Sequence, residues 1–276
     1  MIYFPICKIN IGLNIIEKRN DGFHNIESVF YPIEFKDALE IRPKIEGVTE
    51  LTVTGLPIET KSTDDNLCIK AFKLLKNDFP NISEVEIHLN KIIPMGAGLG
   101  GGSSNATCTL KLLNYLFSLN LNSEELENYA RRIGSDCAFF VKGEPTYAYG
   151  KGDEFKPINL SLKGKTIILI KPDIHISTAE AYSNVEAQKP FYDLYDFISN
   201  EPLDNWKDFI KNDFEVSLSK KYDIFEKIKK ELYNMGAIYS SLSGSGATVY
   251  GIFENQLSCN EINQLVYPFV KQITLK

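Results

Sequence analysis

Long apolar runs are missing from this chain of 276 residues. The stretch TIILI at residues 166–170 is far shorter than the ~18 consecutive apolar residues that a membrane-spanning helix needs. The N-terminal sequence MIYFPICKIN has neither the basic region nor the long apolar core of a secretion signal. We therefore expect a protein that has no contact with a membrane and works in the cytoplasm.

Residues that form disulfides or structural zinc sites are also scarce. The chain has five cysteines and three histidines, with no CxxC pair and no HExxH sequence. An odd number of scattered cysteines cannot all be paired within one chain, so reduced thiols are the simplest interpretation. No structural zinc site or other bound metal of the protein's own is expected from this pattern.

An excess of basic residues is missing as well. The formal net charge is −6 and the sequence pI is about 5.3, whereas a protein that follows a nucleic-acid backbone needs a dense Lys/Arg surface. We therefore expect no nucleic-acid partner. Such a chain can still hold a phosphate locally through main-chain amides.

The apolar pattern predicts strands and helices in both halves without regular βαβ alternation. In the first half it predicts strands at 8–16, 39–45, 51–54 and 85–89, and helices from Asn66, at 103–117, and from Ser123 as N-cap to Gly134. In the second half it predicts strands at 165–170, 247–253 and 271–275, and helices near 178–186, 203–211, 223–235 and 258–267. This order favours an α+β fold with two lobes, residues 1–155 and 156–276.

Five glycines are concentrated at residues 96–102, between a predicted strand and a predicted helix. Glycines let main-chain amides approach a ligand closely, and a new helix adds unpaired N–H groups with partial positive charge. Leu99, between the glycines, is expected to anchor the loop to the core, and Ser103 and Ser104 can donate to phosphate or bind Mg²⁺. The order strand, glycines, helix favours a phosphate site over a flexible surface loop. It is neither a Walker loop nor a Rossmann fingerprint.

Lys8 and Asp136 form a candidate catalytic pair. Lys8 lies on the polar side of the first alternating strand, and Asp136 follows the predicted helix stop at Gly134. A carboxylate can deprotonate an attacking hydroxyl, and a lysine can offset charge on a moving phosphoryl group. From spacing alone, a turn-capping aspartate and a surface lysine are the favoured explanation of the two residues.

A third glycine-containing stretch, SLSGSGATVYG at 241–251, precedes a predicted strand. Taken alone, it is explained as well by a tight turn as by a ligand-binding loop.

These three stretches, in this order, resemble the GHMP kinase superfamily, whose second motif is matched by PMGAGLGGGSSNA. The stretches KRNDGFHNIESVF at 18–30, DDNL at 64–67 and GSDCAFF at 135–140 resemble one family within it, the 4-diphosphocytidyl-2-C-methyl-D-erythritol kinases. The resemblance implies a GHMP kinase fold, with an N-terminal ATP-binding lobe like domain 2 of ribosomal protein S5 and an α+β C-terminal lobe. It also implies ATP and Mg²⁺ as cofactors, and transfer of a phosphoryl group to a small molecule that carries a cytidine diphosphate group.

The resemblance also assigns roles to individual residues. The catalytic pair would be Lys8 and Asp136. The nucleotide would bind to Pro94, Met95, Gly96, Ala97, Gly98, Leu99, Gly100, Gly101, Gly102, Ser103 and Ser104, with Asn66 and Lys91 near the adenine. The acceptor substrate would contact Asn10, Phe23, His24 and Tyr182, with the cytosine ring stacked on aromatic side chains.

Other interpretations differ in the acceptor or in the activity. Phe23 stands where the family usually has tyrosine, and His24 alone would read as a turn residue after Asp21-Gly22. Homoserine or mevalonate kinases of the same superfamily lack a cytidine to bind at such a ring and imidazole. A non-catalytic nucleotide sensor would not need both Lys8 and Asp136, and the acidic pI argues against an RNA-binding protein. We expect a monomer or a weak homodimer.

Overall fold

The computed structural model describes residues 1–58, 62–183 and 185–276, and these residues form two compact units. Unit 1 contains residues 1–8, 35–95 and 100–144, and unit 2 contains residues 9–34, 96–99 and 145–276. Each unit contains several separate segments of the chain. The division into two lobes at residue 155 stays a prediction. Within the described residues, no helix combines the length and the apolar character needed to cross a bilayer.

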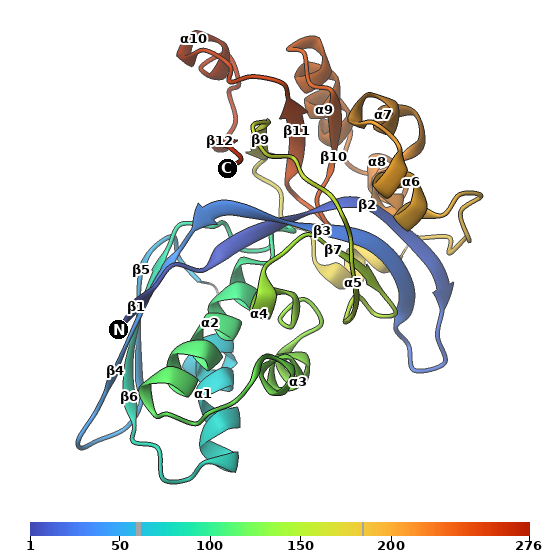
Figure 1. Ribbon diagram of the computed structural model, residues 1–276. Coiled ribbons are helices and arrows are strands. Elements are labelled where there is room, and N and C mark those ends of the chain that lie inside the picture. The colour runs from blue at the N-terminus through green and yellow to red at the C-terminus, as the bar shows by residue number, and fades with distance from the viewer. Residues whose placement is uncertain (59–61, 184) are drawn as a thin grey trace. The chain divides into compact units, whose positions relative to one another are not determined.

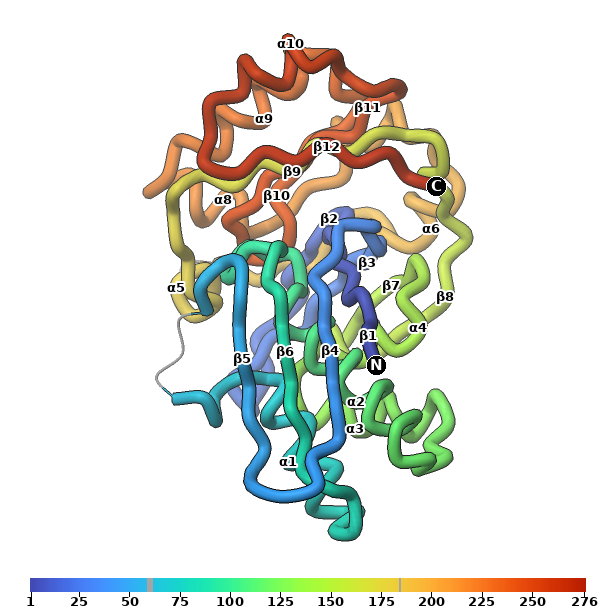
Figure 2. The backbone as a smooth tube through the Cα atoms, turned by 90° about the vertical axis from the view of Figure 1, so that its left-hand side faces the viewer, coloured from blue at the N-terminus to red at the C-terminus, as the bar shows by residue number. Residues whose placement is uncertain are grey.

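Unit 1 is a four-stranded sheet with helices on one face (Figures 1 and 2). The strand order is β1-β4-β6-β5, and all neighbours are antiparallel except the parallel pair β5 and β6. The strands are β1 (Ile2–Tyr3), β4 (Ala38–Pro43), β5 (Glu50–Gly55) and β6 (Val85–Lys91). The helices are the 3₁₀ turn η1 (Thr63–Asp65), α1 (Leu67–Asp78), α2 (Gly101–Leu116), α3 (Ser123–Ile133) and α4 (Phe139–Lys142).

Strand β6 shows why this sheet has one covered face. Its buried residues alternate with more exposed ones, as expected for a strand with one face against the core. Val85, Ile87 and Leu89 are buried, and the alternation then places Lys91 on the same face. The next residues lead directly into the glycine loop, so this strand fixes where the loop begins.

Unit 2 contains two sheets. The first has the order β2-β3-β7-β8 and consists of β2 (Ile6–Lys18), β3 (His24–Lys36), β7 (Thr146–Tyr149) and β8 (Glu154–Pro157); the first residues of β2 and the last of β3 belong to unit 1. The second is antiparallel with the order β10-β11-β9-β12 and consists of β9 (Thr166–Lys171), β10 (Tyr239–Leu242), β11 (Val249–Phe253) and β12 (Phe269–Thr274).

Helices accompany these sheets in the second half of the chain. They are α5 (Thr178–Ser183), α6 (Leu194–Asn200), the 3₁₀ turn η2 (Leu203–Asn205), α7 (Trp206–Phe209), α8 (Asp213–Ser219), α9 (Ile224–Asn234) and α10 (Cys259–Ile262). Helix α9 packs on β10 and β11 (Figure 1). A shared apolar core includes Leu13 and Ile15 of β2, Ile168 and Ile170 of β9, and Phe214 of α8.

Most predicted elements are present, and the structure differs from the helix predictions in several details. The N-cap of α3 is Asn122, not Ser123: Asn122 accepts from the Glu125 amide, and the Glu125 carboxylate accepts from the Asn122 amide. The helix predicted at 178–186 is described only to Ser183, and residue 184 lies outside the described part. The helix predicted at 258–267 is limited to Cys259–Ile262, and the region 203–211 is a 3₁₀ turn followed by one α-helical turn.

The end of β6 is held by a buried carboxylate. Asp37 and Lys91 form an ion pair in which both side chains are fully buried. Asp37 also accepts from the main-chain amides of Ile92 (2.6 Å) and Ile93 (2.8 Å), and from the Asn105 side chain of α2 (2.9 Å). Burial lowers the pKa of Lys91, and the neighbouring Asp37 opposes that shift. The carboxylate therefore joins a strand end, the start of the loop and the helix that follows it.

Replacement of Lys91 by methionine should destabilise the protein strongly. The variant leaves a buried carboxylate without its cation, which typically costs about 3–5 kcal/mol in free energy of unfolding. Urea unfolding followed by circular dichroism measures this. In the control variant Lys73→Met, which removes an exposed ion pair with Asp64, the loss should stay below about 1 kcal/mol. Equal stability of the two variants would contradict the role given to Asp37.

Candidate nucleotide and phosphoryl-transfer site

The glycine loop has a backbone that only glycine adopts readily. Gly96, Gly98 and Gly100 have φ values of 57°, 72° and 67°. A Cβ atom at Gly98 would lie 1.9 Å from the carbonyl oxygen of Ser243, so no side chain fits there. Leu99 is buried, which confirms its predicted role as the anchor of the loop.

Helix α2 begins directly after this loop. Its N-cap, Gly100, has no side chain and so cannot accept from the first amides of the helix. Such amides, together with the helix dipole, favour an anion at this end. Ser103 is half-exposed at the first turn, whereas Ser104 is fully buried and its hydroxyl has no hydrogen-bond partner within the described residues. The predicted contact of Ser104 with phosphate or Mg²⁺ stays a prediction.

The predicted catalytic pair is close in space. Lys8 Nζ lies 3.1 Å from Asp136 Oδ2. The lysine side chain is 3% exposed and the aspartate side chain 35% exposed, so the carboxylate is the more accessible partner. The Lys8 side chain also lies against Gly100, where its Cε would be 3.2 Å from an added Cβ. Lys8, Asp136 and Gly100, which are far apart in sequence, are thus neighbours.

The third glycine-containing stretch supports the start of the loop. Ser243 Oγ donates to the carbonyl oxygen of Gly98 (2.8 Å) and accepts from the main-chain amide of Asn10 (3.2 Å). The amide of Thr248 donates to the carbonyl oxygen of Ala97 (3.2 Å). Sequence reasoning identified this stretch but did not single out Ser243. The repeated Ser-Gly pair at residues 243–246 is the sequence signal that points to Ser243.

Asn10 is buried within the same network. Its side-chain amide donates to Ser28 Oγ (2.9 Å), and its main-chain carbonyl oxygen accepts from the Tyr250 hydroxyl (2.8 Å). Ser28 in turn donates to the carbonyl oxygen of Gly12 (2.6 Å). These bonds hold the polar side of β2 in one conformation. Ser28 and Tyr250 carry no sequence signal that would have revealed this role.

The residues predicted near adenine lie in different surroundings. Asn66 is the N-cap of α1 and borders a cavity of about 260 Å³ in unit 1. Apolar side chains of β5 and the segment after it form most of its lining, namely Leu51, Val53, Leu56, Pro57 and Ile58. Lys91 does not line this cavity, because its side chain is buried against Asp37. Its contact with the nucleotide stays a prediction.

The predicted substrate residues Phe23, His24 and Tyr182 all belong to unit 2. The rings of His24 and Tyr182 stack at a centroid distance of 4.7 Å, and Tyr182 also meets Phe214 edge-on at 4.8 Å. Phe23 is 56% exposed, with Lys151 Nζ 5.3 Å from its ring centroid. Burial lowers the pKa of His24, and Lys18 adds to this, so the surroundings favour the neutral imidazole, a form that can accept a hydrogen bond.

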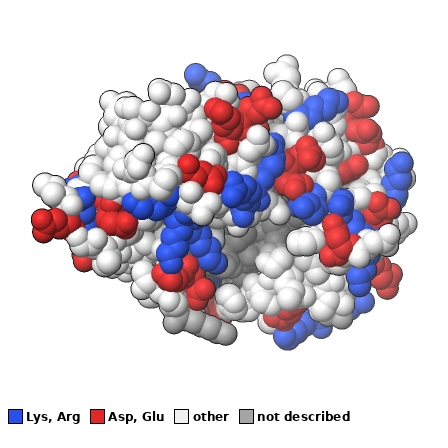
Figure 3. Space-filling view, turned by 90° about the horizontal axis from the view of Figure 1, so that it is seen from below, with Lys and Arg blue, Asp and Glu red and all other residues white. Residues whose placement is uncertain are grey.

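An exposed ion pair stabilises the turn that carries Phe23 and His24. The Arg19 guanidinium lies 3.0 Å from Asp21, which also accepts from the main-chain amide of Phe23 (3.1 Å). Elsewhere on the surface, acidic and basic side chains are interspersed on the face shown in Figure 3, without a broad area of one sign.

Comparisons with known proteins identify the family. The model "GHMP kinases N terminal domain" matches residues 66–144, and the model "GHMP kinases C terminal" matches residues 196–262. The 4-diphosphocytidyl-2-C-methyl-D-erythritol kinase of Bacteroides thetaiotaomicron is 49% identical over 92% of each chain. The enzyme of the same name from Cytophaga hutchinsonii is 47% identical over 93% of each chain. The chain belongs to the GHMP kinase family.

Solved structures of related kinases have the same fold as this GHMP kinase. A 4-(cytidine 5'-diphospho)-2C-methyl-D-erythritol kinase superposes with a TM-score of 0.76 at 24% identity, covering 96% of this chain and 93% of its own. The mevalonate kinase of Methanococcus jannaschii superposes with a TM-score of 0.72 at 16% identity, covering 99% and 96%. The predicted α+β GHMP kinase fold is therefore confirmed, and use of ATP follows from the family.

Replacement of Gly98 by alanine should damage this kinase's loop. The new methyl group would overlap the Ser243 carbonyl, and alanine is strained at a φ of 72°. Together these effects should cost about 2–4 kcal/mol of stability. Gly102→Ala is the matched control, because its Cβ would meet only Leu67 at 3.6 Å, and alanine favours the helix by about 1 kcal/mol. Thermal unfolding of both variants measures the difference, and a stable Gly98→Ala protein would contradict it.

Proposed function

We propose that this GHMP kinase transfers the γ-phosphoryl group of ATP to the 2-hydroxyl of 4-diphosphocytidyl-2-C-methyl-D-erythritol. The products are ADP and the 2-phosphate, and the step belongs to non-mevalonate isoprenoid precursor biosynthesis. The observation that carries the reaction type is the ion pair of Lys8 and Asp136 beside Gly100. The names of relatives that are 45–49% identical over more than nine-tenths of the chain support the choice of acceptor.

Asp136 serves as the general base in this proposal. Its carboxylate is partly exposed, so a hydroxyl can reach it and give up a proton to it. Lys8, whose Nζ lies 3.1 Å from the carboxylate, offsets charge on the phosphoryl group. Because Lys8 is buried, its ammonium stays in place while the proton moves.

The glycine loop and the first turn of α2 bind the phosphates through main-chain amides. The side chains near Asn66 provide an apolar cavity for the adenine ring. ATP supplies the phosphoryl group, and Mg²⁺ neutralises its phosphates when bound. The half-exposed Ser103 hydroxyl is an oxygen donor of the kind that Mg²⁺ prefers, and it would hold the ion together with the phosphates.

Phe23, His24 and Tyr182 recognise the cytidine end of the acceptor. Aromatic rings provide faces on which the base can stack, and the neutral imidazole can accept from its amino group. Asn10 orients the methylerythritol. We further propose that the enzyme works in the cytoplasm as a monomer or weak homodimer, in keeping with five free cysteines.

Conversion of Asp136 to asparagine should lower kcat by a factor of about 10² to 10⁴, equivalent to about 3–5 kcal/mol, because the base is lost while its shape remains. A coupled assay of ADP release with the cytidine-containing acceptor measures this. Asp223→Asn, which changes an exposed ion pair, is the control and should keep full activity. Near-normal turnover of the Asp136 variant would refute the assignment. Activity only with homoserine or mevalonate would refute the proposed acceptor.

Removal of the Tyr182 ring should weaken acceptor binding. In Tyr182→Ala, loss of stacking worth about 1–3 kcal/mol should raise KM for the cytidine-containing acceptor about 5- to 150-fold, with the KM for ATP unchanged. Tyr182→Phe keeps the ring and should behave like the unchanged enzyme. Equal KM values for the alanine and phenylalanine variants would show that the ring does not contact the base.

A further inference from the structure

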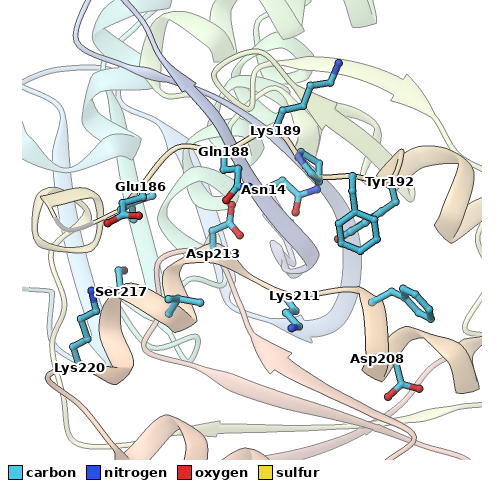
Figure 4. A pocket seen from close by; sticks show the side chains of 15 residues that line it. Asn14, Glu186, Gln188, Lys189, Tyr192, Asp208, Lys211, Asp213, Ser217 and Lys220 are labelled. Carbon is cyan, nitrogen blue, oxygen red and sulfur yellow. The ribbon is translucent and has the colours of Figure 1, made fainter.

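Unit 2 contains a second cavity that none of the residues assigned above lines (Figure 4). Its volume is about 480 Å³. The lining comes from Asn14 of β2, from residues 185–192, and from residues 208–220 around α8. It shares no lining residue with the cavity beside Asn66, and neither His24 nor Tyr182 lines it.

A buried amide nitrogen that makes no hydrogen bond of normal geometry within the described residues lines this cavity. Asn14 is 4% exposed, and its Nδ2 makes no hydrogen bond within the described part of the chain. The Asn14 side chain does interact with the phenol of Tyr192, and this interaction opposes the increase in the pKa of Tyr192 that burial causes. A buried donor without an acceptor costs free energy, so it calls for an explanation such as a ligand oxygen.

A carboxylate that lines the same cavity contacts the residue after Asn14. Asp213 Oδ2 accepts from the main-chain amide of Ile15, the residue after Asn14, at 2.6 Å. The side chain is half-buried, and burial raises its pKa. Among the described residues, no lysine or arginine forms an ion pair with it. A cation placed beside Asp213 would therefore be stabilised.

The rest of the cavity joins apolar walls to a charged margin. Val185, Pro190, Phe209 and Val216 provide apolar surface. Lys211 and Lys220 lie at the margin and form no ion pair within the described residues, although Glu186 and Asp208 line the same cavity (Figure 4). Unpaired charges of both signs in one cavity are complementary to a ligand that carries both signs.

We propose that this cavity binds a free α-amino acid with an apolar side chain. The ammonium group lies against Asp213, a carboxylate oxygen accepts from Asn14 Nδ2, and the side chain contacts the apolar walls. In an α-amino acid the ammonium and the carboxylate are bonded to the same carbon atom, so one ligand can meet an acceptor and a donor that line the same cavity. A simple anion would face Asp213, and a simple amine would leave the Asn14 amide without an acceptor.

Isothermal titration of the full chain with L-leucine and L-phenylalanine tests the ligand class. Nucleotides and the kinase acceptor are left out, so the result does not depend on the proposed function. N-acetyl-L-leucine lacks the ammonium group and isopentylamine lacks the carboxylate, and each should bind at least about tenfold more weakly. The proposal is overturned if neither amino acid binds at millimolar concentration, or if the derivatives bind equally well.

Two asparagine variants test the location. Asn14→Leu should abolish binding, leave kinase turnover unchanged, and raise the Tm of the ligand-free protein because an unpaired buried amide is removed. Asn114→Leu is the matched control: its amide is paired with Leu121 through both atoms at 2.9 Å, so this variant should lose Tm but keep binding. Binding that survives in Asn14→Leu, or that ATP or the acceptor displaces, would place the ligand elsewhere and overturn the proposal.

Discussion

The buried carboxylate of Asp37 is the constraint on which unit 1 depends. One side chain accepts from a lysine at the end of a strand, from two loop amides, and from an asparagine of α2. A charge without water around it is tolerated only when its hydrogen-bonding capacity is filled in this way. The direction in which the chain leaves β6 is therefore fixed before the first glycine is reached. The loop begins from a rigid point although its own residues have few side chains to hold it.

Main-chain contacts then take over where side chains are missing. Gly98 approaches the Ser243 carbonyl so closely that a methyl group would not fit, and Gly100 lies directly against the Lys8 side chain. These glycines are thus required by close approach as well as by their positive φ values. A loop chosen for flexibility would lack such contacts. The glycines hold the main chain in one arrangement, and the proposed binding of phosphates through main-chain amides depends on this.

Local patterns in the sequence predicted the parts of the fold that depend on local causes. The strict alternation before residue 16 and the three/four spacing after Asn66 were sufficient for β2 and α1. Strand β3 was not predicted, because its apolar residues do not alternate regularly. The short helices α6 and α8 have too few residues for a clear period. The contacts of Asp37 and Ser243 were also missed, since they join residues more than 50 positions apart and leave no periodic trace.

Lys8 is buried more deeply than Asp136, so the carboxylate is the more accessible group of the ion pair. A buried ammonium with a carboxylate 3.1 Å away cannot leave the pair without a large desolvation cost, so it is fixed by the fold. The carboxylate is more exposed, and its oxygens have lone pairs that can accept a hydrogen bond from another donor. An incoming hydroxyl therefore meets the acceptor of the pair before the cation. If the burial were reversed, the lysine would be presented first and the same two residues could bind phosphate but could not take a proton from an alcohol. Burial, which no motif encodes, is thus the observation that supports the proposed role of Asp136 as the base.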